Sequence, residues 1–377
     1  MKIAYIATSS IPSSTANSNQ VMKVCQALTQ IGHETCLFIP GRGEITWDDL
    51  KVQYGLTVRF PIERIHSHRL LKRFDFILSA LRQAKKFGAD VLYTRMLWTA
   101  VLAQWMHIPV ILELHDLPAG RFGRQLFSRF LASKSIKITA FITQALKKSI
   151  EANYDLHIPE SESVIAPDGV DLERYQDLPD QTQARQKLGL KETLTAVYTG
   201  GFYKGRGLEL LLPLAGVFPK VQFLWVGGNP QAVEQWKVTI RDLNLENITL
   251  TGFVANELIP LYQAAADILL MPFGRTVTGS SGGDTAQVCS PMKMFEYMAA
   301  GRAILTSDLP VLREVLNDQN ALFYAPEEFE DLRIKFTKLV DDSKLREQLA
   351  KNSKTDAAKY SWQDRMHKIL SVFNEGS

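Results

Sequence analysis

The segment SPMKMFEYMAAG, residues 290–301, has the ends of a helix but carries a cation at the wrong end. Pro291 suits the first helical position, and Gly301 suits the left-handed residue that closes a helix. Lys293 then falls in the first turn, where free backbone N–H groups already make about half a positive charge. Two explanations stay open. Either Glu296 compensates Lys293 as a surface ion pair, or an anion lies between Lys293 and the helix N-terminus.

A second segment with anion-binding chemistry is VYTGGFYKGRG, residues 197–207. It leaves an apolar strand, contains four glycines and places Lys204 and Arg206 before the next helix. Glycine lets backbone N–H groups approach an anion closely, and the two cations supply charge where a phosphate would lie. The segment has neither the G-x-G-x-x-G dinucleotide pattern nor a Walker-type G-K-S/T. We therefore expect a phosphate site, with a purely structural turn as the alternative.

Two polar groups in the first half of the chain also follow apolar strands. In LELHDLP, His115 and Asp116 stand at a strand end, and the small polar residues 9–20 include Asn17 and Asn19. In an open α/β sheet, ligands bind at the carboxyl ends of the strands. We therefore expect His115 to face a ligand and residues 9–20 to approach a polyhydroxylated one. A packed core histidine and a plain capped loop are the alternatives.

The elements that must position these residues are βαβ units. Apolar runs rich in Val and Ile alternate with amphipathic stretches, which is typical of parallel sheets covered by helices on both faces. The predicted strands are 2–8, 34–40, 91–95, 110–115, 140–144, 163–169, 194–201, 221–228, 248–254, 266–273 and 303–308. The polar stretch 172–190 indicates a linker. We therefore predict two doubly wound α/β domains, over residues 1–176 and 177–359.

The composition is that of a folded chain. Its 377 residues exceed what one hydrophobic core usually holds, and 46% hydrophobic with 22% charged content is typical of globular proteins. The three cysteines, Cys25, Cys36 and Cys289, predict reduced thiols and a cytoplasmic setting. The sequence has no signal-peptide pattern and no apolar run of about 18 residues, so we expect no membrane span.

The net charge of +3 hides a basic segment. Residues 59–148 contain sixteen Lys and Arg against five Asp and Glu, which leaves the rest of the chain at −8. Within this segment, residues 69–88 and 120–137 interleave basic residues with Phe and Leu at helical spacing, the pattern of helices on an anionic membrane surface. Solvated basic helices with a core-facing apolar side are the alternative. The sequence has no nucleic-acid motif, and we expect no nucleic-acid partner.

Five segments together resemble the retaining glycosyltransferases of family 4, which have the GT-B fold. The strongest is SPMKMFEYMAAGRAILTSDLPVLREVL, residues 290–316, which is similar to the family's donor-site helix and the strand after it. The others are residues 11–34, 165–175, 197–212 and 251–273, so the resemblance covers nearly the whole chain. It implies two Rossmann-like domains facing a cleft, with the final helix, 360–377, crossing back to the first domain.

The resemblance also implies roles for single residues. The catalytic residues would be His115 on the reacting side of the sugar, and Arg206 and Lys293 at the leaving diphosphate. Glu296 would bind the ribose hydroxyls. The implied donor-binding set is Gly200, Gly201, Lys204, Arg206, Phe253, Ser290, Lys293 and Glu296. The implied acceptor-side set is Asn17, Asn19 and Asp116.

The sequence departs from the family's pattern at three positions. Val288 stands where the family often has a Glu that contacts the donor sugar, Asp168 replaces an Asn, and Gly201 stands where Arg is frequent. The donor sugar is therefore not assigned. The polar loop 274–287 is the expected source of substitute contacts, from Ser280, Ser281, Asp284 and Thr285.

The resemblance implies an enzyme that moves a hexose from a UDP- or GDP-type nucleotide sugar to a hydroxyl acceptor and retains the anomeric configuration. The acceptor would be lipid-linked or a growing glycan. We expect no cofactor and no metal, because the cations at the donor site take the metal's part. A catalytically silent nucleotide-sugar-binding partner of a transferase is the alternative. We expect a cytoplasmic protein, and a peripheral position on the inner face of the membrane stays open.

Overall fold

The computed structural model describes residues 1–67, 73–118, 120–277 and 284–375, which form two compact units. Unit 1 comprises Met1–Asp168 and Trp362–Ser377, and unit 2 comprises Gly169–Ser361. The sequence had placed this boundary at residue 176. The chain after Gly169 joins unit 2 earlier because the hydroxyl of Tyr175 donates a hydrogen bond of 2.9 Å to Gln263 Oε1, deep in that unit.

Unit 1 contains a seven-stranded parallel sheet in the order β3-β2-β1-β4-β5-β6-β7. Strands β4, β5 and β6 are buried along their whole length, as expected when helices cover both faces. In chain order the elements are β1 (Lys2–Ile6), α1 (Ala16–Gln30), β2 (Glu34–Pro40), α2 (Trp47–Tyr54), β3 (Ile62–Ile65), α3 (Phe74–Phe87), β4 (Val91–Thr94), α4 (Leu97–Trp105), β5 (Val110–Leu114), α5 (Gly123–Ala132), β6 (Lys137–Phe141), α6 (Gln144–Tyr154), β7 (Ser163–Ile165) and α14 (Trp362–Glu375).

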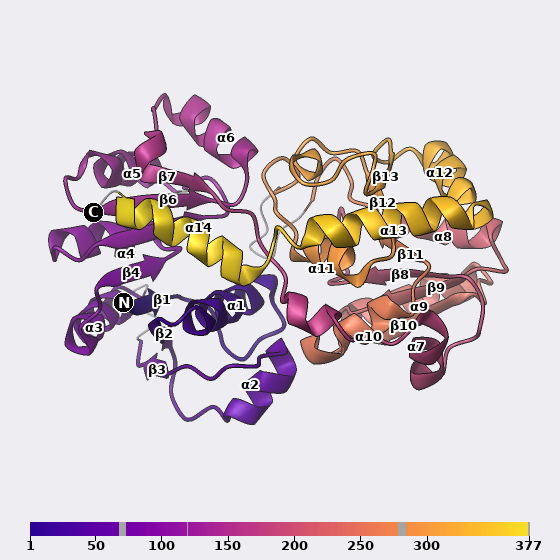
Figure 1. Cartoon of the computed structure of the whole chain (residues 1–377), viewed down its shortest axis with the longest axis horizontal. Coiled ribbons are helices and arrows are strands. Elements are labelled where there is room, and N and C mark those ends of the chain that lie inside the picture. The colour runs from indigo at the N-terminus through magenta and orange to yellow at the C-terminus, as the bar shows by residue number, and fades with distance from the viewer. Residues whose placement is uncertain (68–72, 119, 278–283, 376–377) are drawn as a thin grey trace. The chain divides into compact units, whose positions relative to one another are not determined.

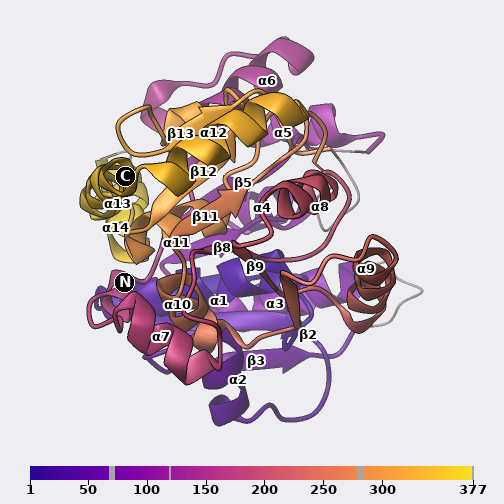
Figure 2. The ribbon, with the colours of Figure 1, turned by 90° about the vertical axis from the view of Figure 1, so that its right-hand side faces the viewer.

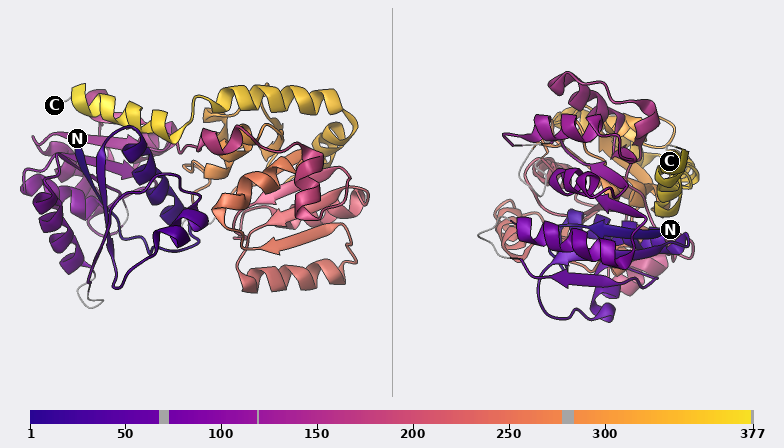
Figure 3. Two further views of the ribbon diagram at one scale, coloured as in Figure 1. Left: turned by 60° about the horizontal axis from the view of Figure 1, so that its bottom comes forward. Right: turned by 90° about the vertical axis from the view of Figure 1, so that its left-hand side faces the viewer.

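Helix α14 belongs to unit 1 although it comes last in the chain. It packs beside α1 on one face of the sheet, against β6 and β7 (Figure 1). Helices α3, α4 and α5 cover the other face (Figure 3). The apolar side chains of α14 that face the sheet are Trp362, Met366, Ile369, Leu370 and Phe373. Within the described ranges, no helix is both long and apolar enough to cross a bilayer.

Unit 2 repeats the plan with a six-stranded parallel sheet in the order β10-β9-β8-β11-β12-β13. Its sheet lies between α8 and α9 on one side and α10 and α13 on the other (Figure 2). The elements are α7 (Gln181–Leu188), β8 (Thr195–Thr199), α8 (Leu208–Val217), β9 (Gln222–Val226), α9 (Pro230–Asp242), β10 (Ile248–Gly252), α10 (Ile259–Ala264), β11 (Ile268–Met271), α11 (Met292–Ala300), β12 (Ala303–Ser307), β13 (Leu322–Tyr324), α12 (Phe329–Asp341) and α13 (Ser343–Ala357). Two doubly wound domains, as predicted, are therefore confirmed.

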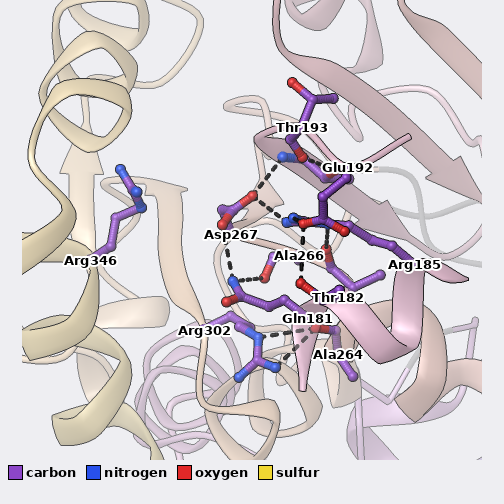
Figure 4. A network of polar contacts seen from close by, with 12 residues as sticks. Gln181, Thr182, Arg185, Glu192, Thr193, Ala264, Ala266, Asp267, Arg302 and Arg346 are labelled. Carbon is purple, nitrogen blue, oxygen red and sulfur yellow. Dashed lines mark hydrogen bonds and ion pairs between the residues drawn. The ribbon is translucent and has the colours of Figure 1, made fainter. Parts of the chain in front are cut away.

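A polar network fastens α7 to the sheet of unit 2 (Figure 4). The buried guanidinium of Arg185 pairs with Asp267 at 2.6 Å and with Glu192 at 2.7 Å. Asp267 also accepts a 2.7 Å hydrogen bond from the backbone of Thr195, the first residue of β8. Each charge in this network has a partner, so its role is to hold the fold together.

Candidate functional site

In unit 2 the strand order reverses between β8 and β11, which is where open α/β sheets bind ligands. Gly200 follows β8 directly, and helix α11 begins beside it. A Cβ atom on Gly200 would lie 2.8 Å from Nζ of Lys293, so the lysine reaches the end of the strand and lies against this glycine. The side chain of Tyr297 holds α11 in place, because its hydroxyl accepts a 2.8 Å hydrogen bond from the backbone of Thr199.

The ammonium group of Lys293 is buried, and no carboxylate of the described residues forms a hydrogen bond with it. Its Nζ atom lies 3.8 Å from the ring centroid of Tyr198 and 5.5 Å from that of Phe273. In the part of the chain that the structure describes, Nζ has no hydrogen-bond partner. Burial and the nearby charge of Arg206 lower the pKa of Lys293 well below its usual value, although the charge of Glu296 acts in the opposite direction. Cation–π contacts of about 0.5–2 kcal/mol offset only part of the cost of burying such a charge.

Arg206 reaches the same place from the glycine-rich loop. Its guanidinium lies 4.9 Å from the ring centroid of Phe273, which Lys293 also approaches. The loop folds tightly onto residues 272–277: a Cβ on Gly205 or Gly207 would lie 2.0 or 1.6 Å from a backbone oxygen there. The structure thus brings together the two cationic segments that the sequence predicts to share one anion.

Glu296 and Ser290 flank the start of α11. Gln263 donates a 3.4 Å hydrogen bond to Glu296 Oε2, and Ser290 is buried just before the helix. The helix starts one residue later than predicted, because the extended backbone of Pro291 makes it the capping residue. Gly301 ends the helix in the left-handed conformation, as predicted.

The other residues that the resemblance implies for the donor site have fewer contacts with Lys293 and Arg206. Lys204 is exposed, and Phe253, just after β10, is 55% exposed, leaving a free aromatic face. The ring of Tyr203, which is 42% exposed, occupies the space beside Gly201, and a Cβ there would lie 2.3 Å from it. Val288 is buried.

Loop 274–287 is described only in part. Ser280 and Ser281 fall in residues 278–283, which lie outside the described residues. Asp284 Oδ1 accepts hydrogen bonds from the backbones of Val277 and Ala286, at 2.9 and 3.0 Å, and these bonds lower the pKa of the carboxyl group. One oxygen of Asp284 therefore fastens the loop.

Unit 1 carries a cavity of about 280 Å³ at the carboxyl ends of β4 and β5. His115 and Asp116 both line it, as does Arg95, which sequence reasoning missed. The remaining wall is mostly apolar and comes from Leu97, Trp98, Glu113, Leu114, Leu117, Pro118, Gly123 and Leu126. The cavity therefore offers polar groups at the sheet and an apolar surface opposite.

The two asparagines in the first turn of α1, Asn17 and Asn19, differ in their relation to this cavity. Asn17 Oδ1 accepts 3.0 Å hydrogen bonds from Arg95, which lines the cavity, and from Ser9. Asn19 lies about 200° further round the helix and is half-buried, and it does not line the cavity. The structure thus brings Asn17, but not Asn19, to this place.

Behind His115 lies a buried charge network around Glu113. Arg365 of α14 pairs with Glu113 Oε2 at 3.0 Å, and Gln20 of α1 donates to Oε1 at 2.5 Å. Tyr93 donates to Oε2, and His115 Nε2 contacts Oε1. Burial alone would raise the pKa of Glu113, but the charge of Arg365 and the interaction with His115 outweigh it and lower the pKa.

His115 is held in one protonation state. Burial and the positive charge of Arg95 lower its pKa to about 4, so the ring is neutral at pH 7. The ionised Glu113 can only accept a hydrogen bond, so Nε2 of His115 carries the proton and Nδ1 is an acceptor. A side chain that is only 17% exposed thus presents a neutral acceptor at the cavity wall.

Glu113, His115 and Asp168 also place three possible metal ligands within 4.8 Å of one another. Sequence reasoning did not anticipate this group, because Asp168 comes much later in the chain. Arg365 already pairs with Glu113, and its charge opposes a second cation there. Both carboxylate oxygens of Glu113 are engaged, so the group fits a charge-balanced network better than a metal centre.

The comparisons with known proteins agree with this fold. The model of the family "Glycosyltransferase Family 4" matches residues 18–174, and that of "Glycosyl transferases group 1" matches residues 193–342. Between them they cover most of the chain. The chain therefore belongs to glycosyltransferase family 4, has the GT-B fold and is a glycosyltransferase.

Two relatives and one solved structure illustrate the likeness. The chain is 24% identical to an alpha-galactosylglucosyldiacylglycerol synthase of Streptococcus pneumoniae over 72% of each chain. It is 22% identical to a phosphatidyl-myo-inositol mannosyltransferase of Mycolicibacterium smegmatis, over 94% of this chain and 89% of the relative. The structure of Anabaena HepE in complex with UDP matches all of both chains at a TM-score of 0.76 and 17% identity, and HepE has also been solved with UDP-glucose.

Sequence reasoning missed the residues behind the two sites, although signals for some of them exist. Glu113 is a charged residue inside the apolar run VILEL, and Arg365 falls on the apolar stripe of the last helix. Either is unusual unless the charge is paired. Tyr198 and Phe273, which lie under Lys293, carry no such signal because aromatic residues are common in cores.

Proposed function

We propose that this glycosyltransferase takes its sugar from a nucleoside diphosphate sugar of the UDP or GDP type, held by unit 2. The observation that carries the proposal is the buried Nζ of Lys293, which has no hydrogen-bond partner among the described residues and lies beside Arg206 at the N-terminus of α11. A diphosphate would supply the missing negative charge to both cations and to the free helical N–H groups. The binding of UDP and UDP-glucose by HepE supports this choice.

The proposed transfer retains the anomeric configuration. The bond from the sugar C1 to the diphosphate oxygen breaks while the acceptor oxygen bonds to C1 on the same face. The acceptor's proton passes to the leaving phosphate oxygen. Lys293 and Arg206 stabilise the negative charge that develops on the diphosphate, so no metal ion is required. Glu296 would hold the ribose hydroxyls.

The acceptor would be a lipid-linked molecule or a growing glycan that presents its hydroxyl in the cavity of unit 1. His115 Nδ1 would accept a hydrogen bond from a sugar hydroxyl beside the reacting carbon, and Asp116 and Asn17 would contact further hydroxyls. The apolar wall around Trp98, which is 40% exposed, suits a sugar face or the start of a lipid chain. The names of the two relatives, which concern a diacylglycerol and a phosphatidylinositol, support a lipid-linked acceptor.

The basic segment would bring the enzyme to an anionic membrane surface. On α3, Phe74 and Leu78 are exposed beside exposed cations, although Phe76 and Ile77 of the same helix belong to the core. The exposed ring of Trp105 on α4 lies 5.0 Å from the guanidinium of Arg129 on α5. Exposed aromatic rings among cations suit a headgroup region. Not every cation of the segment is available, because two buried lysines, Lys137 and Lys147, are paired with Glu162 and Glu160.

The function is tested by turnover. UDP-glucose, UDP-galactose and GDP-mannose are incubated with vesicles that contain diacylglycerol, phosphatidylinositol or a glucosyldiacylglycerol, with and without EDTA. We expect one donor to be consumed, EDTA to have no effect, and NMR of the product to show retention. Nucleotide binding without any turnover would instead support a catalytically silent binding partner. Val288 favours this alternative, because it stands where the family often has a Glu that contacts the donor sugar.

The membrane proposal is tested separately by vesicle sedimentation. Binding should require anionic lipid and weaken with salt, because the Debye length falls to about 8 Å at physiological ionic strength. Replacing Arg129 and the exposed Lys85 by Gln should weaken binding, whereas a matched double replacement of exposed cations of unit 2, Lys237 and Lys344, should not. Equal binding to neutral and anionic vesicles would overturn the proposal.

A further inference from the structure

The contacts of Arg365 extend from the last helix to the wall of the acceptor cavity. Its Nη2 pairs with Glu113 Oε2 at 3.0 Å, and the other oxygen of that carboxylate contacts Nε2 of His115. Its Nε donates to the backbone oxygens of Ala166 and Pro167, at 3.2 and 2.8 Å. Its side chain is only 3% exposed and that of Glu113 is fully buried, so the ion pair is shielded from water.

The arrangement constrains the imidazole of His115. The carboxylate of Glu113 could rotate about its last bond if nothing held its second oxygen, and the ring would then follow it. Arg365 of α14 and Tyr93 of β4 hold Oε2, while Gln20 of the neighbouring helix α1 holds Oε1. Groups from three elements thus fix the carboxylate, and its acceptor oxygen determines which ring nitrogen is protonated.

We propose that Arg365 is a positioning residue for His115: through Glu113 it fixes the imidazole as the Nε2–H form, with Nδ1 turned into an acceptor for the sugar hydroxyl. The contact with a sugar hydroxyl rests on the function proposed above. The orientation of the imidazole of His115 does not depend on that function. The last helix therefore completes the acceptor site rather than only covering the sheet. The groups that face His115 are Glu113, Arg95, Arg365 and Asp168, and Arg365 is the only one of them on α14.

The test is NMR of the ring nitrogens in the full-length protein labelled with nitrogen-15, where His115→Gln identifies the signals of His115. In the wild-type protein at pH 7 we expect one protonated and one bare nitrogen. Arg365→Lys should keep this pattern because the charge remains. Arg365→Met should move the two signals toward each other, as the tautomers mix, and raise the pKa of His115, because the charge of Arg365 lowers it in the wild-type protein.

Two further variants separate positioning from mere stability. Arg185→Met removes an equally buried, paired arginine from unit 2 and should leave the signals of His115 unchanged. Should Arg365→Met fail to fold, Glu113→Gln provides the same test, because an amide can donate as well as accept and should also mix the tautomers. Wild-type signals of His115 in either variant, if it folds, would overturn the proposal, because Arg365 is proposed to act on the ring through Glu113. Thermal shifts with UDP on the same samples test nucleotide binding alone. If UDP does not raise the melting temperature, the proposed donor fails, but the NMR result for His115 is unaffected.

Discussion

In unit 1 the buried guanidinium of Arg365 meets a carboxylate, a tyrosine hydroxyl and two backbone oxygens, whereas in unit 2 the buried ammonium of Lys293 meets two aromatic rings and a second cation. Burial lowers the pKa of Lys293, and Arg206 lowers it further. Burial also disfavours the charge of Arg365, but Glu113 outweighs it and raises the pKa. A buried charge that has an ion-pair partner, such as Arg365, stabilises the fold. A buried charge that forms no hydrogen bond, such as Lys293, indicates where a ligand would supply the opposite charge.

The largest expected difference between the two cations is in stability. Arg365→Met should lower the free energy of unfolding by about 3–5 kcal/mol, because it leaves the buried Glu113 without its cation. Lys293→Met should leave the stability of the ligand-free protein unchanged or raise it. The substitution removes a buried ammonium group that forms no hydrogen bond in that state. Thermal unfolding of both variants without nucleotide measures the contrast. An equal loss in both would show that Lys293 is as well balanced as Arg365.

The next effect concerns Asp168, beside the paired network. Burial and the charge of Glu113 raise its pKa to about 7, although Arg365 acts in the opposite direction. Because the folded-state pKa is raised, the folded state keeps the proton longer, and stability is lost as the pH rises from about 4 to about 7. Asp168→Asn should therefore raise the melting temperature at pH 8 by roughly 5 °C. The gain should shrink toward pH 4.

The control for this prediction is Asp177→Asn, which changes an exposed carboxylate. It should shift the melting temperature little at either pH. A gain for Asp168→Asn that does not depend on pH would show that its carboxylate carries no unfavourable charge at neutral pH.

A smaller effect is expected in the pH dependence of nucleotide binding. Lys293 has a lowered pKa in the free protein, and a bound diphosphate would restore its proton. At a pH where the free lysine has lost its proton, binding requires proton uptake, so the affinity for UDP should be lower at an alkaline pH than at a neutral one. Calorimetry in two buffers of different ionisation enthalpy would measure the proton taken up. Lys293→Met should bind weakly at both pH values and take up no proton.

The sequence predicts most of the fold because its strands are buried and its helices amphipathic. It missed β3 and β13, one edge strand of each sheet, since IERI alternates charged with apolar residues and LFY is only three residues long. It also placed the boundary after Tyr175, because composition does not reveal a single buried tyrosine that anchors the chain to unit 2.

Some residues of the candidate sites could likewise be predicted from the sequence, and others could not. Lys293 and Arg206 could be predicted, because a cation in the first turn of a helix and another in a glycine-rich loop are unusual locally. Glu113 and Arg365 could not be paired from the sequence, because they come from elements that lie far apart in the chain. Local chemistry is visible in a sequence, whereas the partner of a buried charge requires the three-dimensional structure.

The central claim, that the unbalanced cation of unit 2 awaits a diphosphate, is tested most directly by titrating UDP and GDP into the wild-type protein, Lys293→Met and Arg365→Lys. A charge-assisted hydrogen bond is worth about 1.5–3 kcal/mol, so Lys293→Met should bind the preferred nucleotide roughly ten-fold to a hundred-fold more weakly. Arg365→Lys should bind it as tightly as the wild-type protein. Unchanged diphosphate affinity in Lys293→Met would contradict the account.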